Sequence, residues 1–186
     1  MENKHQFIIV VAGFQASGKT TMAKMIEENY NISRIAGDDI RKFIWSTIKY
    51  YEGMDHSHKN PLINSANITV ENTRKSLFDE LMNQEQSVII DGAGFSVEQR
   101  QRWLSKEVKD KYGVKTILIY VKADEEALVK RYKERDKTKG KWKDTYFKTR
   151  KDAFEEPKPE EADYFFTATN GQEDLVLKEL DSILKP

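Results

Sequence analysis

The chain has 186 residues, with 31 Lys or Arg against 31 Asp or Glu, so its formal net charge at neutral pH is zero. This balance argues against a globally basic nucleic-acid binder, although it leaves room for a local basic patch. The absence of cysteine excludes disulfides, thiolate metal sites and cysteine nucleophiles. The length suits one domain over residues 1–186 with its own hydrophobic core.

The first predicted element is an apolar run over residues 7–12 that ends at Gly13. A continuous apolar run of this length predicts a strand that is buried on both faces. The run is too short for a signal peptide or a membrane span. We therefore expect a cytoplasmic protein with no membrane partner.

The rest of the first half predicts two helix–strand alternations and one long helix. The patterns predict a helix over 19–29, a strand over 32–36, a helix over 39–48, a loop over 50–59 and a long helix from Asn60-Pro61. The stripe predicted to be buried on the long helix is Ile63, Ala66, Val70, Leu77 and Leu81. On the same helix, Asn72, Arg74 and Lys75 face either an acceptor molecule or water. His56 and His58 in the preceding loop are predicted to be surface residues rather than metal ligands, since no third ligand is evident, but the loop remains a candidate for substrate recognition.

The second half continues the alternation. It predicts strands over 87–90, 114–121 and 164–167, helices over 96–112, 124–135, 146–154 and 172–184, and a polar loop over 137–143. Five strands with helices between them predict an α/β fold, in which helices flank a five-stranded parallel sheet. Ligands bind beyond the carboxyl ends of such strands, and Gly13, Asp38, Asp91 and Lys122 all fall at that edge.

The segment after the first strand carries the most specific motif. Residues 13–20, GFQASGKT, match the pattern G-x-x-x-x-G-K-[ST], between a predicted strand and a predicted helix. Glycines let the backbone N–H groups turn inward around an anion, and the helix that follows presents its positive end to the same anion. The predicted nucleotide-binding residues are Gly13, Phe14, Gln15, Ala16, Ser17, Gly18, Lys19, Thr20 and Thr21. In this prediction Lys19 contacts the β- and γ-phosphates, and the Thr20 hydroxyl ligates Mg²⁺.

The remaining motifs favour a kinase over other phosphate-loop proteins. Residues 91–94, DGAG, fit D-x-x-G, which a GTPase uses to sense the γ-phosphate, but the chain has no N-K-x-D element to read guanine. This absence also favours ATP over GTP. Asp91 is predicted to contribute to the Mg²⁺ site, next to Thr20.

A candidate acceptor site follows the second predicted strand, in the segment GDDIR over residues 37–41. A carboxylate at this edge can accept the proton of an attacking hydroxyl, as in phosphoryl transfer. We assign this role to Asp38 and the helix cap to Asp39, although the pattern also permits the reverse. Arg41, one helical turn further on, is predicted to hold the acceptor.

A basic segment over about residues 130–151 is predicted to form a lid. It holds 11 Lys or Arg against 3 Asp or Glu. Most of these side chains are expected to form a solvated surface. Arg131 and Arg135 are exceptions, because they share one helix face and can stabilise the charge that develops on the transferring phosphoryl group.

These segments together resemble the polynucleotide-kinase-like, AAA/zeta-toxin-like branch of the P-loop kinases. The segments that carry the resemblance are GFQASGKT, GDDIR, VIIDGAG and LVKRYKER, and more loosely FEEPKPEEADY, within residues 7 to about 165. The resemblance implies a general-base role for Asp38, an acceptor contact for Arg41, and phosphoryl contacts for Arg131 and Arg135. It further implies a five-stranded parallel sheet with the phosphate loop after the central strand. Residues 91–94 depart from the D-[AG]-T-N that is common in this branch, because the polar Thr-Asn pair is missing at this position.

We therefore expect an ATP- and Mg²⁺-dependent kinase whose acceptor is a 5′-hydroxyl or similar alcohol on a nucleic acid. A nucleoside, sugar or other metabolite is the alternative acceptor. A regulatory ATPase or switch that transfers phosphate only to water, and a binding module without catalysis, remain alternatives from other classes.

Overall fold

The structure is a computed structural model that describes residues 6–51, 62–92, 94–137, 144–169 and 171–185. Its elements in chain order are β1 (Phe7–Ala12), α1 (Lys19–Tyr30), β2 (Ser33–Ala36), α2 (Gly37–Thr47), the 3₁₀ turn η1 (Lys49–Tyr51), α3 (Leu62–Asn83), β3 (Val88–Asp91), α4 (Val97–Leu104), α5 (Lys106–Tyr112), β4 (Lys115–Lys122), α6 (Glu125–Lys137), α7 (Asp144–Asp152), the 3₁₀ turn η2 (Pro159–Glu161), β5 (Tyr164–Thr169) and α8 (Glu173–Leu184). Within these ranges, no helix combines the length and the apolar composition that crossing a membrane requires.

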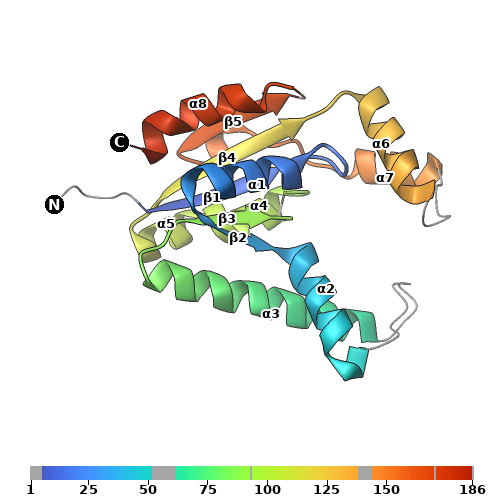
Figure 1. The fold of residues 1–186 in the computed structure, drawn as a ribbon, viewed down its shortest axis with the longest axis horizontal. Coiled ribbons are helices and arrows are strands. Elements are labelled where there is room, and N and C mark those ends of the chain that lie inside the picture. Colours follow the sequence, from blue (N-terminus) through green and yellow to red (C-terminus); the bar gives the residue numbers. More distant parts are fainter. Residues whose placement is uncertain (1–5, 52–61, 93, 138–143, 170, 186) are drawn as a thin grey trace.

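The five strands form one parallel sheet in the order β2-β3-β1-β4-β5, as Figure 1 shows. The central strand is β1, where Ile9 is paired with Ile89 of β3 on one side and with Ile117 of β4 on the other. The predicted fold is thereby confirmed, with the phosphate loop after the central strand. All six residues of β1 are buried, as expected for a strand covered on both faces.

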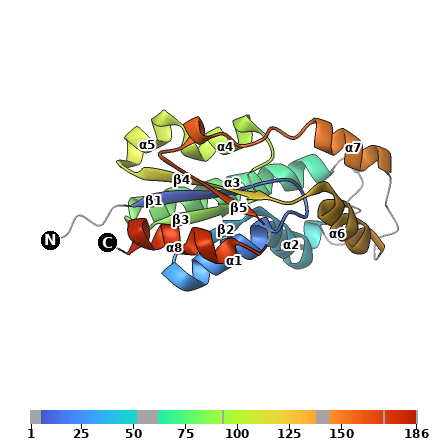
Figure 2. The ribbon, with the colours of Figure 1, turned by 90° about the horizontal axis from the view of Figure 1, so that it is seen from above.

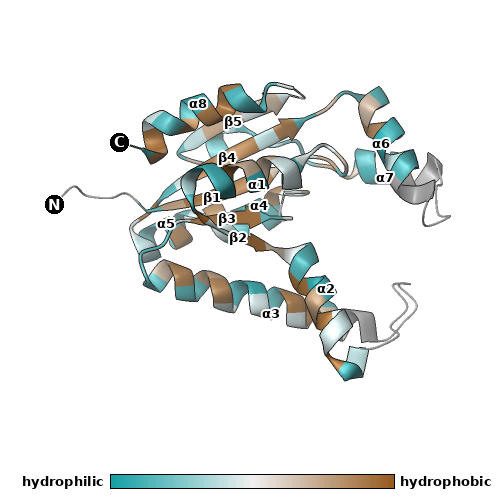
Figure 3. Cartoon of the chain, viewed as in Figure 1, coloured by the Kyte–Doolittle hydropathy of each residue, from teal (hydrophilic) through white to brown (hydrophobic). Residues whose placement is uncertain are grey.

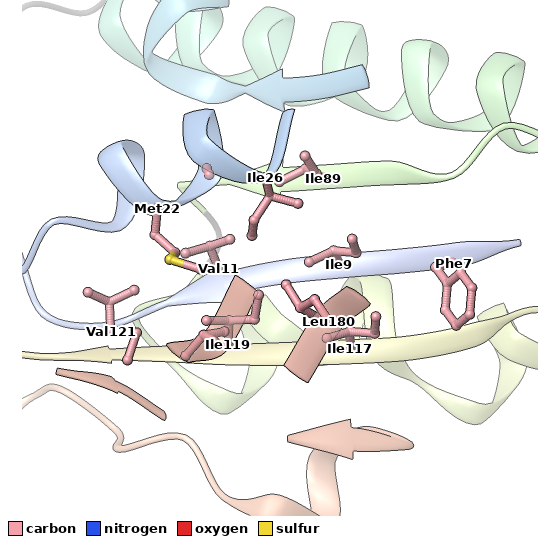
Figure 4. Packing of buried hydrophobic residues seen from close by; sticks show 13 residues of the cluster. Phe7, Ile9, Val11, Met22, Ile26, Ile89, Ile117, Ile119, Val121 and Leu180 are labelled. Atoms are coloured by element: carbon pink, nitrogen blue, oxygen red, sulfur yellow. The ribbon is translucent and has the colours of Figure 1, made fainter. Parts of the chain in front are cut away.

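Helices cover the two faces of the sheet with separate apolar clusters (Figure 2). Ile9 and Val11 of β1 point to one face, where they pack with Met22 and Ile26 of α1 and with Leu180 of α8 (Figure 4). Side chains alternate along a strand. Ile8, Val10 and Ala12 of β1 therefore face the other way and pack against α3, α4 and α5. Apolar colour accordingly concentrates on the strands and on the inward sides of the helices (Figure 3).

The carboxyl ends of the strands carry the elements that frame the candidate site. In Figure 1, α6 and α7 extend beyond this edge on one side and α2 extends beyond it on the other, while both chain termini lie at the opposite end. This arrangement brings the phosphate loop, the start of α2 and the end of β3 to a common edge.

The predicted single helix over 96–112 is wrong, because the structure has two helices there. Ser105 lies between α4 and α5 with φ −61° and ψ 158°, which is extended backbone. It serves as the C-cap of α4 and as the N-cap of α5. Serine competes for backbone hydrogen bonds and therefore favours helix ends. The predicted start at Ser96 and the predicted stop at Gly113 are both confirmed as caps.

The buried stripe of α3 follows a strict four-residue spacing that the prediction only partly captured. Ala66 and Val70 are buried as predicted, but Leu77 is 45% exposed. Phe78 and Met82 are buried in its place, because they continue the i, i+4 row that starts at Ala66. Leu81 packs partly buried beside this row, while the side chain of the predicted Ile63 is outside the described residues.

The assignment of Asp39 as a helix cap is also wrong. α2 begins at Gly37 with Ala36 as its N-cap, so Asp38 and Asp39 both lie in the first turn. A carboxylate in the first turn still interacts favourably with the positive end of the helix. The loop with His56 and His58, and most of the loop over 137–143, lie outside the described residues.

Candidate active site

The phosphate loop takes a conformation that its glycines make possible. Gly13 has φ 149° and Gly18 has φ 107°, which is the region that side chains disfavour. A Cβ on Gly13 would stand 2.4 Å from the carbonyl oxygen of Val121, so β4 approaches the loop too closely for any side chain. The loop is thus held against the sheet at the point where β1 ends.

The loop and the start of α1 present polar groups that suit an anion. The N-cap of α1 is Gly18, which supplies no side-chain acceptor to the N–H groups of the first turn. Ser17 is buried, and its hydroxyl has no hydrogen-bond partner in the described part of the chain. The unpaired N–H groups at this helix start are donors that a phosphate satisfies, whereas the Ser17 hydroxyl lies beside Gly13 within the loop.

An open cavity of about 800 Å³ lies over this loop. Its lining residues are Gln15, Ala16, Gly18, Lys19, Thr20, Thr21, Asp38, Asp91, Gly92, Arg131, Glu134 and Glu173. The cavity therefore joins the phosphate loop to the start of α2, the end of β3 and the face of α6. Its size is in the range of small-molecule binding sites.

Most of the predicted nucleotide-binding residues line this cavity, but three support the loop instead. Gly13 approaches β4, Ser17 is buried beneath the loop, and the ring of Phe14 is buried among other aromatic rings. The carbonyl of Phe14 accepts a hydrogen bond from Lys19 Nζ at 2.7 Å. This contact holds the lysine over the loop, within the cavity lining.

The pair predicted to serve Mg²⁺ is brought together by β1, α1 and β3. Thr20 Oγ1 donates to Asp91 Oδ1 at 3.4 Å, and Asp91 is buried. A hydroxyl next to a carboxylate provides the hard oxygen donors that Mg²⁺ prefers. The residues present thus fit this ion.

Arg34 on β2 is a contributor to the site that the sequence patterns did not reveal. Its guanidinium contacts three carboxylates, those of Asp91 at 3.0 Å, Asp39 at 2.8 Å and Glu27 at 2.9 Å. The hydrogen bond from Arg34 holds the pKa of Asp39 below its ordinary value. A lone arginine in a four-residue strand carries no motif, so only the meeting of β2, α1 and β3 in space identifies it.

The predicted acceptor residues lie next to each other on α2. Asp38 lines the cavity with an exposed side chain, and its Oδ1 accepts from Arg41 Nη1 at 2.5 Å. The guanidinium of Arg41 also lies over the ring of Trp45, 5.7 Å from its centroid. Arg41 is therefore held beside Asp38, but it is not among the residues that line the cavity.

The basic helix α6 reaches the phosphate loop through Arg131. Arg131 Nη1 lies 3.4 Å from the carbonyl oxygens of Ala16 and Ser17, and the residue lines the cavity. Arg135 follows one turn later on α6, but its side chain is outside the described residues. Lys122, predicted at the same edge, pairs with Glu156 at 3.4 Å.

An aromatic cluster joins the phosphate loop to α6 and α7. Phe14 makes edge-to-face contacts with Phe147 of α7 and with Phe154, at centroid distances of 5.3 and 5.7 Å. Tyr132 of α6 contacts Phe147 at 5.6 Å. The cluster fixes where α6 presents Arg131 to the loop.

Comparisons with known proteins identify the family of the chain. A family model described as an AAA domain matches residues 8–157. An adenylate kinase of Flavobacterium johnsoniae is 31% identical over 139 residues, which cover 72% of this chain and 69% of the relative.

Two solved structures share the fold at low sequence identity. A candidate kinase from Chloroflexus aurantiacus has a TM-score of 0.76 and 14% identity, with 97% of this chain and 98% of the other covered. Chaetomium thermophilum Kti12 in complex with ADP-AlF3 has a TM-score of 0.61 and 16% identity, with 96% and 98% covered. The chain belongs to this AAA domain family and is a P-loop phosphotransferase of the kinase type.

Proposed function

We propose that the protein transfers the γ-phosphate of ATP, with Mg²⁺, to a hydroxyl of an acceptor molecule that enters beside Asp38. The observation that carries the proposal is that Lys19, Thr20, Asp38 and Arg131 line one cavity. In-line phosphoryl transfer requires a base, groups that bind the phosphates and a cationic side chain, and this cavity has all three.

In the proposed reaction, the oxygen of the acceptor hydroxyl bonds to the γ-phosphorus, and Asp38 accepts the proton of that hydroxyl. The bond between that phosphorus and the β,γ-bridging oxygen breaks, which releases ADP. Lys19 and the loop N–H groups hold the phosphates, while Arg131, with Arg135, stabilises the charge on the transferring group. Thr20, with Asp91 beside it, would hold Mg²⁺, which neutralises charge on the phosphoryl oxygens when it is bound.

The proposed acceptor is a 5′-hydroxyl or similar alcohol on a nucleic acid. Two features support this class, namely the resemblance of GDDIR to the polynucleotide-kinase-like branch and the basic segment over 130–151. The zero net charge and the similarity to an adenylate kinase favour a small molecule, rather than a polynucleotide, as the second candidate for the acceptor.

The test incubates the protein with γ-labelled ATP, Mg²⁺ and a panel of DNA and RNA 5′ ends, nucleosides and sugars. We expect label on one class of acceptor, and we expect Asp38→Asn to abolish this transfer while nucleotide binding persists. Asp110→Asn is the control, since it removes an exposed carboxylate that does not line the cavity, and it should retain transfer. Label released only as inorganic phosphate, with no effect of Asp38→Asn, would instead identify a regulatory ATPase.

Salt separates the two acceptor classes. A polynucleotide acceptor releases counterions when it binds. Its KM should therefore rise steeply between about 50 and 200 mM salt, because salt weakens contacts to the phosphates. An uncharged nucleoside or sugar should show little change in KM over the same range.

A further inference from the structure

Arg74 occupies a position on α3 where the helix pattern calls for an apolar residue. The i, i+4 row of buried positions on α3 runs through Ala66, Val70, Phe78 and Met82, with Arg74 at its centre. Arg74 is only 4% exposed, whereas its neighbours Asn72 and Lys75 are exposed. Buried arginines are rare unless they are paired, so this one requires an explanation.

The guanidinium of Arg74 is only partly satisfied. Its Nη1 donates to Glu71 Oε1 at 3.0 Å. Its Nε and Nη2 are shielded from water, and within the described part of the chain neither has a hydrogen-bond partner. The group lies over the ring of Trp103, 5.3 Å from the centroid, but a ring face does not replace two hydrogen bonds. Buried charged donors without acceptors are costly, so an acceptor oxygen is expected to join them.

A small cavity of about 60 Å³ lies next to this side chain. Its lining residues are Glu71, Arg74, Gly92, Gln99, Arg102 and Trp103. Since a water molecule takes up about 30 Å³, the space suits about two waters or one carboxylate or phosphate group. Two arginines and one glutamate line it, so the charge at its wall is net positive.

The small cavity adjoins the acceptor side of the candidate active site. Gly92, directly after Asp91, lines both this cavity and the larger one over the phosphate loop. Gly37, directly before Asp38, packs against Arg74, since a Cβ there would lie 3.4 to 3.5 Å from three atoms of the Arg74 side chain. A molecule with its hydroxyl beside Asp38 would thus have Arg74 in its immediate surroundings.

We propose that Arg74, with Arg102, forms a subsite for an anionic oxygen group of the acceptor, a carboxylate or a phosphate. The inference rests on the proposed kinase function, because it names a feature of the acceptor. The guanidinium fork matches such groups with paired hydrogen bonds, and the two free donors of Arg74 supply them. The anionic group is carried either by a small hydroxy acid or phosphorylated alcohol, or by the first phosphodiester of a nucleic acid with a free 5′-hydroxyl.

The experiment measures binding and transfer separately on the full chain, with ADP and Mg²⁺ present in the binding assay. Its anionic probes are D-gluconate, glycerol 3-phosphate and the 5′-hydroxyl dinucleotide TpT. Their uncharged counterparts are sorbitol, glycerol and thymidine. Trp103 lines the subsite and reports binding through its fluorescence, and Trp103→Phe identifies its share of the signal. We expect at least one anionic probe to bind saturably while its uncharged counterpart does not, and the probe that binds identifies the source of the anion.

Two variants test the assignment to Arg74. Arg74→Gln should lower the affinity for the anionic probe by about tenfold or more, because hydrogen bonds to a charged group are lost. Arg102→Gln removes an exposed side chain that pairs with Glu98, so this variant should fold even if Arg74→Gln does not. It should lower the affinity for the same probe by about two- to fivefold. Equal binding of charged and uncharged probes, or unchanged anion binding in both variants, would overturn the subsite.

The binding assay and the transfer assay test the subsite and the kinase function separately. Anion binding that depends on Arg74, without phosphoryl transfer to any alcohol, supports the subsite and contradicts the proposed kinase function. Transfer to an uncharged alcohol at a rate that Arg74→Gln does not alter supports the kinase and overturns the subsite.

Discussion

Arg34 Nη1 on β2 donates to Asp91 Oδ2 on β3 at 3.0 Å, which leaves the other oxygen of Asp91 for Thr20 Oγ1. The same guanidinium pairs with Asp39, so one residue links the predicted Mg²⁺ site to the first turn of α2. Arg34 is thus a positioning residue for both carboxylates, and it acts from a strand that carries no recognisable motif.

Replacing Arg34 should destabilise the protein and weaken its affinity for Mg²⁺. Arg34→Gln leaves the buried Asp91 carboxylate without its cation, which typically costs about 3–5 kcal/mol in the free energy of unfolding. Urea denaturation measures this loss, and the Mg²⁺ concentration for half-maximal nucleotide binding should rise. Lys42→Gln is the control, because Lys42 is exposed and lies 3.7 Å from Asp39. An equal effect of the two variants would contradict the positioning role.

Phe14 should matter to both stability and nucleotide binding. Phe14→Ala removes a buried ring from the aromatic cluster, at a typical cost of about 3–5 kcal/mol. Because the cluster joins the phosphate loop to α6 and α7, nucleotide affinity should fall as well. Phe14→Leu keeps most of the buried volume and should show a smaller change in both urea denaturation and calorimetric nucleotide binding. Normal nucleotide affinity in a destabilised Phe14→Ala would show that the cluster serves the fold alone.

The pair formed by Arg100 and Glu161 should be one of the strongest tertiary links in the chain. Arg100 is fully buried, and its fork contacts Glu161 at 2.6 and 2.9 Å and the carbonyl of Glu155 at 2.8 Å. Glu161→Gln should lower the free energy of unfolding by about 3–5 kcal/mol, since it leaves a buried guanidinium without its counter-charge. Glu160→Gln, at the exposed neighbouring position, should change it by less than about 0.5 kcal/mol. Thermal or urea unfolding that is the same for both variants would refute the prediction.

Asp163 should make the free energy of unfolding depend on pH in the acidic range. Burial raises its pKa, but hydrogen bonds from the Thr116 N–H and hydroxyl and the pair with Lys109 outweigh burial and hold the pKa below its ordinary value. A lowered pKa means that the stabilisation is present above the unfolded-state pKa and is lost as pH falls through the folded-state pKa. Asp163→Asn should therefore reduce stability at neutral pH and flatten the decline in stability as the pH falls through and below the ordinary Asp pKa of 3.8, as measured by urea denaturation.

The control for this prediction is Asp110→Asn on the exposed side of α5. This variant should keep the acid-dependent decline of the wild type. A decline that persists in full in Asp163→Asn would assign it to other carboxylates.

The sequence by itself determined the order of the strands and helices and the position of the phosphate loop. The apolar run of β1, the glycine pattern and the alternation of elements are local signals, and the i, i+2 period of strands and the i, i+4 period of helices encode such signals directly. Errors arose where two local preferences compete, as at Ser105, which divides the predicted helix, and at Asp39, which lies inside a helix that begins two residues earlier.

Only the tertiary structure decided which charged residues meet. Arg34 finds three carboxylates from three elements, Arg100 finds Glu161 at a sequence separation of 61, and Arg74 lies buried beside Gly37 and Gly92. No local pattern distinguishes Arg34 and Arg100 from arginines on the surface, and the i, i+4 row of α3 places Arg74 inside without naming its partners. A charge is tolerated in the interior only when distant segments bring its partners to it. The packing of α2, α3 and α4 around the end of β3 is what turns a surface-type residue into part of a candidate binding site.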